Sequence, residues 1–182
     1  MTRRTLYLIG CAAPPVLHLA EPIRGAQARG WDVCCILTPR AHRWASEEEG
    51  YLEKLRALTG RPVRHEYKLP GQPDEHPSPD ALLVAPLTNN TLNKWAAGIS
   101  DTLALGLITE GLGLGLPIVA LPYLNAAQAR HPAVRHSVDI LRRERVTLLL
   151  STGEAAGFTP HPPRQGDVDA FPWELALDAL PA

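Results

Sequence analysis

Five short apolar runs alternate with longer stretches of helical character along this chain of 182 residues. Short runs that are apolar throughout are typical of strands buried on both faces, as in parallel sheets covered by helices. The alternation predicts βαβ units, and with them a single-domain, doubly wound (Rossmann-like) three-layer α/β sandwich with a mostly parallel sheet. The predicted strands are Thr5–Ala12, Trp31–Leu37, Ala81–Ala85, Pro117–Leu121 and Val146–Leu150.

The intervals between these runs are mostly predicted helix. The exceptions follow the second helix, where Val63–Tyr67 is predicted as an edge strand and Lys68–Pro79, rich in Pro, Gly and acidic residues, as a loop. Residues 1–150 are predicted to form the α/β domain, and 151–182, with five prolines, an irregular segment packed on the same domain. The expected helices are 14–29, Ala41–Leu58, Leu92–Ala97, Asp101–Leu112 and Pro132–Glu144.

Gly111, Gly113 and Gly115 imitate a dinucleotide-binding fingerprint. They precede a predicted strand, whereas the G-x-G-x-x-G motif follows one, and its third glycine would fall at Leu116. We therefore interpret these glycines as the end of a helix and a turn into Pro117.

Composition and charge argue against several classes of function. The formal net charge is −1 and Lys and Arg are scattered, which is not typical of a nucleic-acid-binding protein. The uncharged stretch Gly111–Ala129 is interrupted by prolines such as Pro117, so we predict a buried strand with loops and no membrane span. The three cysteines, Cys11, Cys34 and Cys35, predict no disulfide framework and no metal site, and they indicate a reducing, cytoplasmic location.

The loops that follow the strands are the candidate binding loops, because open parallel sheets bind ligands at the carboxyl ends of their strands. Gly10, Cys11 and Ala12 follow the first strand and open a helix. Small residues there let backbone N–H groups approach an anion, although a tight turn needs small residues as well. Thr38 ends the second strand, where its hydroxyl is placed either to donate to the same anion or to cap the next helix.

The segment from Pro86 to Trp95 is the most informative part of the chain. A buried strand runs directly into four consecutive polar side chains at the start of a helix, whereas capping requires only one. The surplus is better suited to binding a flat polar heterocycle than to closing a turn. The four residues are Thr88, Asn89, Asn90 and Thr91.

This segment and its continuation to Leu103 resemble the signature of the homo-oligomeric flavin-containing cysteine decarboxylases. The pattern of that family is Pro, two or three small or polar residues, Asn-Thr, and then Lys-x-x-x-Gly-x-x-Asp. The likeness extends over most of the chain, with Gly10 in the family's phosphate loop and Thr38 and Trp44 at its hydroxyl and aromatic positions. The matching signature residues are Pro86, Asn90, Thr91, Lys94, Gly98 and Asp101.

The resemblance implies that the cofactor is FMN and that residues 1–150 are a flavin-binding domain. It also implies a homo-oligomer, a trimer or a multiple of trimers, in which a neighbouring subunit completes the site. We expect Trp95, near the signature helix, to belong to apolar surface that the monomer leaves uncovered. The FMN-binding residues that the resemblance implies are Gly10, Cys11, Ala12, Thr38, Trp44, Pro86, Leu87, Thr88, Asn90 and Thr91.

A second likeness concerns the substrate. Pro122–Asn125, followed by His131 and Pro132, resembles the family's substrate loop, in which Asn125 would contact the substrate carboxylate. The implied reaction is oxidative decarboxylation of a cysteine or of a peptide C-terminal cysteine. Leu124 replaces the family's Met, and the tail lacks the cysteine that phosphopantothenoylcysteine decarboxylases use, so we do not expect a role in pantothenate metabolism.

The catalytic base is not assigned. The family's histidine precedes the signature proline by fourteen residues, and 86 − 14 = 72 is Gln72 here. His76, the nearest by position, and His65 are the alternatives in this segment. The competing function is an FMN-binding protein of the same fold without decarboxylase activity, acting as a carrier, a redox partner or a subunit of an assembly.

Overall fold

The computed structural model describes residues 3–151 and 157–182. Its strands form one parallel sheet in the order β2-β1-β3-β4-β5. This is a doubly wound order, whose topological switch point lies between β1 and β3, and it confirms the predicted fold class. The strands are β1 (Arg4–Gly10), β2 (Trp31–Leu37), β3 (Ala81–Leu87), β4 (Ile118–Pro122) and β5 (Thr147–Leu148).

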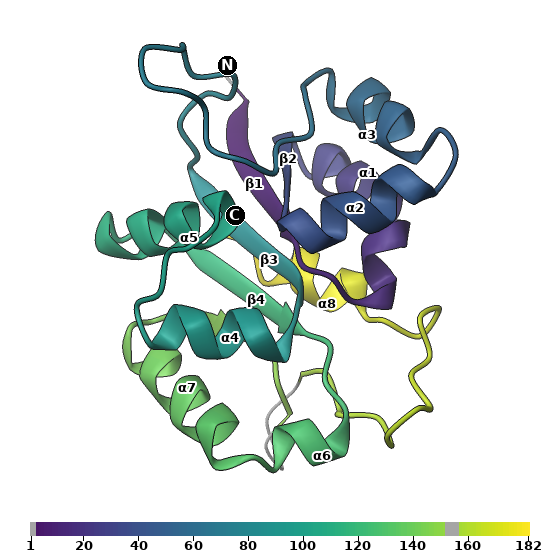
Figure 1. Cartoon of the computed structure of the whole chain (residues 1–182), viewed down its shortest axis with the longest axis vertical. Coiled ribbons are helices and arrows are strands. Elements are labelled where there is room, and N and C mark those ends of the chain that lie inside the picture. The colour runs from purple at the N-terminus through teal and green to yellow at the C-terminus, as the bar shows by residue number, and fades with distance from the viewer. Residues whose placement is uncertain (1–2, 152–156) are drawn as a thin grey trace.

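Helices cover both faces of the sheet. In Figure 1, α4 (Asn89–Ala96), α5 (Leu103–Gly113) and α7 (Pro132–Arg143) lie in front of the sheet and α8 (Trp173–Asp178) lies behind it. On that rear side α8 packs against α1 (Ala20–Ala28). The shorter elements are the 3₁₀ helix η1 (Pro14–His18), α2 (Pro39–Glu47), α3 (Tyr51–Thr59) and α6 (Ala126–Ala129).

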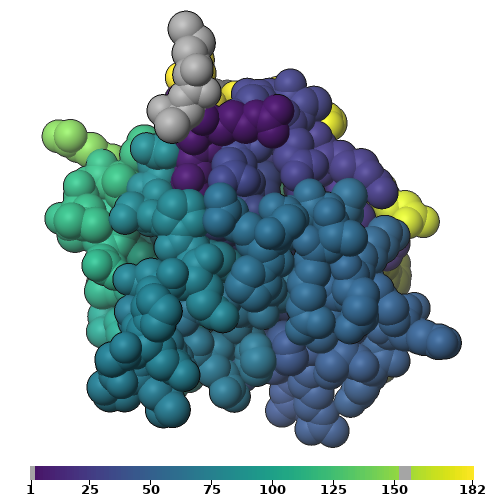
Figure 2. Space-filling model, turned by 90° about the horizontal axis from the view of Figure 1, so that it is seen from above, coloured from purple at the N-terminus to yellow at the C-terminus, as the bar shows by residue number. Residues whose placement is uncertain are grey.

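Two predicted elements after β2 differ from the structure. The single helix expected over Ala41–Leu58 is two helices, α2 and α3, because Gly50 between them has a φ of +69° that a helix cannot accommodate. The edge strand expected at Val63–Tyr67 is reduced to one parallel bridge between Arg64 and Ile36. In the space-filling view from above (Figure 2), the blue-to-teal part of the chain, which includes α3 and the segment leading to β3, forms much of the near surface.

The described part of the C-terminal segment contains a helix that we did not expect. Trp173 and Leu177 of α8 are buried, and Arg29 at the end of α1 forms ion pairs with Glu174 and Asp178 at 2.7 and 2.5 Å. Gly25 allows the close approach of the two helices, because a Cβ atom there would lie 2.4 Å from the Leu177 Cδ1 atom. The segment therefore supplies side chains to the core.

The core consists of strand residues and the helix faces that cover them. Cys34 and Cys35 are buried, and burial raises the pKa of their thiols to about 11 and about 12, so both are neutral thiols. Trp95 is also buried, with 3% of its surface exposed, so the expectation that it forms uncovered apolar surface is wrong. None of the helices in the described ranges is long and apolar enough to span a bilayer.

Candidate functional site

A cleft of about 380 Å³ opens at the carboxyl ends of the strands. It lies at the switch point of the sheet, where doubly wound folds bind their ligands, because its walls follow β1, β2 and β3. Its size is in the range of sites for small molecules and cofactors. The polar or loop residues that line it include Ala12, Thr38, Arg40, Thr88, Asn90 and Thr91.

Backbone hydrogen bonds of the turn after β1 link the carboxyl ends of β1, β2 and β3. Cys11 N donates to Pro86 O at 3.0 Å, and Thr38 N donates to Gly10 O at 3.0 Å. A Cβ atom at Gly10 would lie 2.9 Å from side-chain atoms of Leu37 and Val16, so the packing leaves room only for glycine. Gly10 and Cys11 thus hold the turn to the ends of β2 and β3, and Ala12 is the residue of this turn that lines the cleft.

Cys11 is a packed thiol and not an exposed ligand. Its side chain is fully buried and makes hydrogen bonds with Thr91 and Thr88. Burial raises the pKa of the thiol, and these hydrogen bonds offset that effect only in part. Cys11 therefore connects the turn after β1 to the start of α4.

Thr38 occupies the N-cap position of α2, but its side chain makes no capping hydrogen bond. The residue nevertheless lines the cleft. The Thr38 hydroxyl therefore does not cap α2 and is available to a ligand in the cleft.

The four polar residues after β3 make different contacts at the start of helix α4. Thr88 caps the helix by accepting from Thr91 N at 3.4 Å, and Thr88 Oγ1 also donates to Thr91 Oγ1 at 3.1 Å. Asn89 accepts from Asn93, which in turn accepts from Ser137 of α7 at 2.8 Å. Asn90 is exposed, lines the cleft and makes no side-chain hydrogen bond to any described residue. Its amide is the surplus polar group that the sequence pattern predicts.

Lys94, Gly98 and Asp101 of the signature form the junction between α4 and α5. The Lys94 ammonium pairs with the Asp101 carboxylate, and Gly98 follows the end of α4 with a φ of +72°. Lys94 also lines the cleft, as does Arg40 at the start of α2. Arg40, a cationic side chain on the cleft at the N-terminus of α2, favours an anionic ligand, whereas the charge of Lys94 is paired with Asp101.

Other predicted cofactor and substrate residues do not line this cleft. Trp44 is half-buried against the core, and Pro86 and Leu87 are buried at the end of β3. Asn125 caps α6, since its side chain accepts from Gln128 N at 2.9 Å while the Gln128 side chain accepts from Asn125 N at 3.0 Å.

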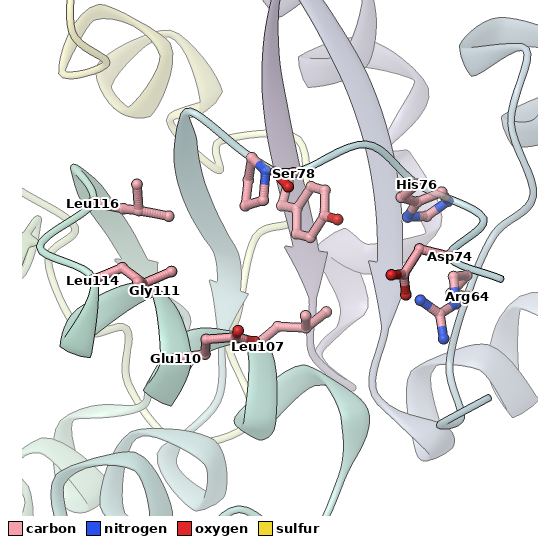
Figure 3. Close-up of a pocket in the computed structure, with 11 residues that line it drawn as sticks. Arg64, Asp74, His76, Ser78, Leu107, Glu110, Gly111, Leu114 and Leu116 are labelled. Carbon is pink, nitrogen blue, oxygen red and sulfur yellow. The ribbon is translucent and has the colours of Figure 1, made fainter. Parts of the chain in front are cut away.

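Neither Gln72 nor His76 lies at the cleft. Gln72 is exposed and accepts from Leu69 N at 2.8 Å, closing a turn. His76 is 5% exposed, its Nε2 atom is 2.9 Å from Pro62 O, and burial lowers its pKa. Figure 3 shows His76 beside Asp74 and Arg64 in a separate pocket of about 260 Å³, which is also lined by residues that precede β3 and β4. The position of His76 therefore does not support it as the replacement base.

Two histidines that follow β2 stack on each other, and neither lines the cleft. His42 of α2 stacks on His65, with ring centroids 3.5 Å apart and planes 8° apart. We did not single out His42 from the sequence, because the pairing joins two residues that only the chain path after β2 brings together.

Residues 11–163 match the model of the Flavoprotein family. The chain is 40% identical over 63 residues to phosphopantothenoylcysteine decarboxylase of Mus musculus, an alignment that covers 35% of this chain and 30% of that protein. Curated relatives are matched over 16% to 30% of their own length.

Two solved structures superpose over almost the whole chain. The FMN-dependent cysteine decarboxylase TvaF from thioviridamide biosynthesis has a TM-score of 0.65 and 23% identity, with 98% of each chain covered. The FMN-binding protein AtHal3 has a TM-score of 0.68 and 17% identity, with both chains covered completely. At this identity the likeness establishes the fold. The family model matches most of the chain, and together with this shared fold the match shows that the chain belongs to the Flavoprotein family.

Proposed function

We propose that this protein binds FMN in the cleft at the switch point and catalyses the oxidative decarboxylation of a cysteine or of a peptide C-terminal cysteine. The main support for the cofactor assignment is that polar side chains lining the cleft are available to a ligand. The Asn90 amide has no side-chain partner among the described residues, and the Thr38 hydroxyl makes no capping bond. Arg40 adds a positive charge that suits a phosphate, whereas the charge of Lys94 is already paired with Asp101.

The residues present fit FMN, which is an anionic phosphate joined to a flat ring with a polar edge. Thr38, with its free hydroxyl, and Arg40 would hold the phosphate beside the turn after β1, and Asn90 would hydrogen-bond the polar edge of the ring. When bound, FMN supplies the hydride acceptor for the reaction. The substrate loses carbon dioxide and two hydrogens and becomes an enethiol, and Asn125 would hold the carboxylate before it leaves.

The test is to load the purified protein with FMN and incubate it with a synthetic peptide that ends in cysteine. We expect yellow protein with about one FMN per chain, and a peptide product lighter by carbon dioxide plus two hydrogens in mass spectrometry. The same peptide ending in serine is the control, because it offers no thiol. Colourless protein that does not bind added FMN would refute the cofactor assignment.

The second candidate function is FMN binding without decarboxylation, in a carrier, a redox partner or an assembly subunit. It is favoured by the positions of Gln72, exposed in a turn, and His76, buried in another pocket. Yellow protein that leaves the cysteine peptide unchanged would select this function.

We also propose a homo-oligomer, a trimer or a multiple of trimers, that acts in the cytoplasm. Asn90 is exposed at the open side of the cleft, and Tyr67, Leu69 and Leu114 are large apolar side chains at 58%, 68% and 68% exposure. Exposed apolar surface of this kind is often covered by association. Light scattering on the yellow preparation distinguishes this assembly from a monomer.

Replacing Asn90 by alanine is expected to weaken FMN binding by about 1–3 kcal/mol, because a polar edge of the flavin would lose its partner. Fluorescence titration of the apoprotein with FMN measures the effect. Asn125→Ala is the matched control: Asn125 does not line the cleft, so FMN affinity should stay unchanged while the KM for the peptide rises. Equal FMN affinity in Asn90→Ala and the wild type would remove Asn90 from the site.

A further inference from the structure

The pocket that contains His76 lies at the opposite edge of the sheet from the cleft. Pro79 and Leu116, which line this pocket, come just before β3 and β4. Helix α5 runs between the two cavities, because Leu105 near its start lines the cleft and Glu110 near its end lines the pocket. The pocket is therefore separate from the proposed FMN site.

One wall of the pocket is apolar. Leu107 and Leu114, at α5, and Leu116 line this wall, across the pocket from His76 and Arg64 (Figure 3). Leu114 keeps 68% of its surface exposed, and covering such surface with an apolar group is favourable. The wall therefore favours a ligand with an apolar stem.

The pocket has one carboxylate without a counterion. Arg64 pairs with Glu75 at 3.1 Å. Asp74 pairs with Lys68 at 2.7 Å. Glu110, on the helix that carries the leucines, forms no ion pair with any described residue. The unpaired charge along the pocket is therefore negative and attracts a cation.

The neutral polar groups of the pocket are hydrogen-bond acceptors. His76 Nε2 lies 2.9 Å from Pro62 O, and because a carbonyl oxygen only accepts, Nε2 carries the proton. Burial lowers the pKa of His76, so the ring is neutral and its Nδ1 atom is an acceptor, which has no partner among the described residues. The Tyr7 hydroxyl donates its proton to Pro77 O at 2.8 Å and keeps its oxygen lone pairs. Since buried polar atoms usually have a partner, this surplus of acceptors favours a ligand rich in donors.

We propose that this pocket is a second binding site, for a small organic cation with a primary ammonium group on a short apolar stem. The ammonium group supplies three N–H donors and pairs with the Glu110 carboxylate, while the leucines cover the stem. A bare metal ion does not suit the site, because the described ranges contain no group of three or more His, Cys, Asp or Glu side chains that could hold one. No step of the decarboxylation uses this site.

The first test is an NMR titration of the purified full chain with 3-methylbutylamine. We expect saturable shifts of the resonances of Glu110, His76 and Leu114, and binding about fivefold tighter than that of 3-methylbutan-1-ol, since an exposed ion pair contributes about this factor. The alcohol has the same stem without the charge, and 3-methylbutanoate, which carries the opposite charge, should bind more weakly than either. Equal affinity for the amine and the alcohol would overturn the cation, and the absence of saturable shifts at the pocket would overturn the site.

The second test separates charge from apolar contact. Glu110→Gln is expected to lower the affinity for the amine about fivefold, to that of the alcohol, and to leave the alcohol unaffected. Glu21→Gln, an exposed carboxylate on α1 that does not line the pocket, is its matched control. Leu114→Ser should weaken both probes, whereas Leu69→Ser, equally exposed at 68% but outside the pocket, should weaken neither.

Each control has an outcome that contradicts the site. Wild-type affinity for the amine in Glu110→Gln, or the same loss in Glu21→Gln, would overturn the pairing with Glu110. Equal losses in Leu114→Ser and Leu69→Ser would show non-specific apolar binding and overturn the pocket as the binding site. Circular dichroism of the four variants, all at exposed positions, shows that each is folded.

Discussion

Replacing Trp173 by alanine is expected to lower the free energy of unfolding by about 3–5 kcal/mol, the usual cost of truncating a large buried aromatic side chain. Trp173 is 3% exposed and meets the Phe171 ring edge-on at a centroid distance of 4.7 Å. Its helix, α8, also packs on α1. Urea denaturation followed by circular dichroism measures the change.

Glu174→Gln is the control for this prediction, because it changes the neighbouring residue without touching the core. The Glu174 side chain is 69% exposed, and its ion pair with Arg29 is a surface pair worth at most about 1 kcal/mol. Similar small losses in both variants would show that the C-terminal segment contributes little to the stability of the α/β domain.

Replacing Gly10 by valine is expected to abolish FMN binding and to lower the free energy of unfolding by about 1–3 kcal/mol, the cost of overpacking. Already the first added carbon would lie 2.9 Å from side-chain atoms of Leu37 and Val16. The turn after β1 must then shift, and its hydrogen bonds to the ends of β2 and β3 shift with it. The FMN content of the purified protein and a urea titration report the two effects.

Gly113→Ala is the matched control, since a Cβ atom at Gly113 would meet nothing within 4 Å. Alanine at this last residue of α5 should leave FMN binding intact and leave stability equal or slightly higher. Full FMN content in Gly10→Val would mean that the turn after β1 tolerates displacement and does not shape the cofactor site.

Local sequence patterns determined the sheet and the edge at which its binding loops gather. β2 has the predicted bounds, and β1, β3 and β4 agree within a few residues, because continuous apolar runs are the direct mark of strands buried on both faces. Of the polar residues after β3, Thr88, Asn90 and Thr91 line a cleft. Parallel strands end at one edge, so the residues that follow them meet there without further information.

The tertiary structure decided which of those polar residues remain free. Asn89 is hydrogen-bonded to Asn93, which Ser137 of α7 also contacts, whereas Asn90, the asparagine that the signature matches, remains exposed at the cleft. Trp95 is buried for the same reason: its burial depends on what packs over α4, not on its neighbours in the sequence.

Long-range contacts also decided where Gln72 and the C-terminal helix lie, which spacing along the sequence did not predict. Counting back from Pro86 leads to Gln72, but the chain path after β2 places that residue in an exposed turn and brings His65 onto His42. The helix α8 lies in a proline-rich segment and gains its stability by packing on α1. Spacing along the chain describes strands and helices well, because their hydrogen bonds and periodicity are local; which side chains meet depends on packing between distant segments.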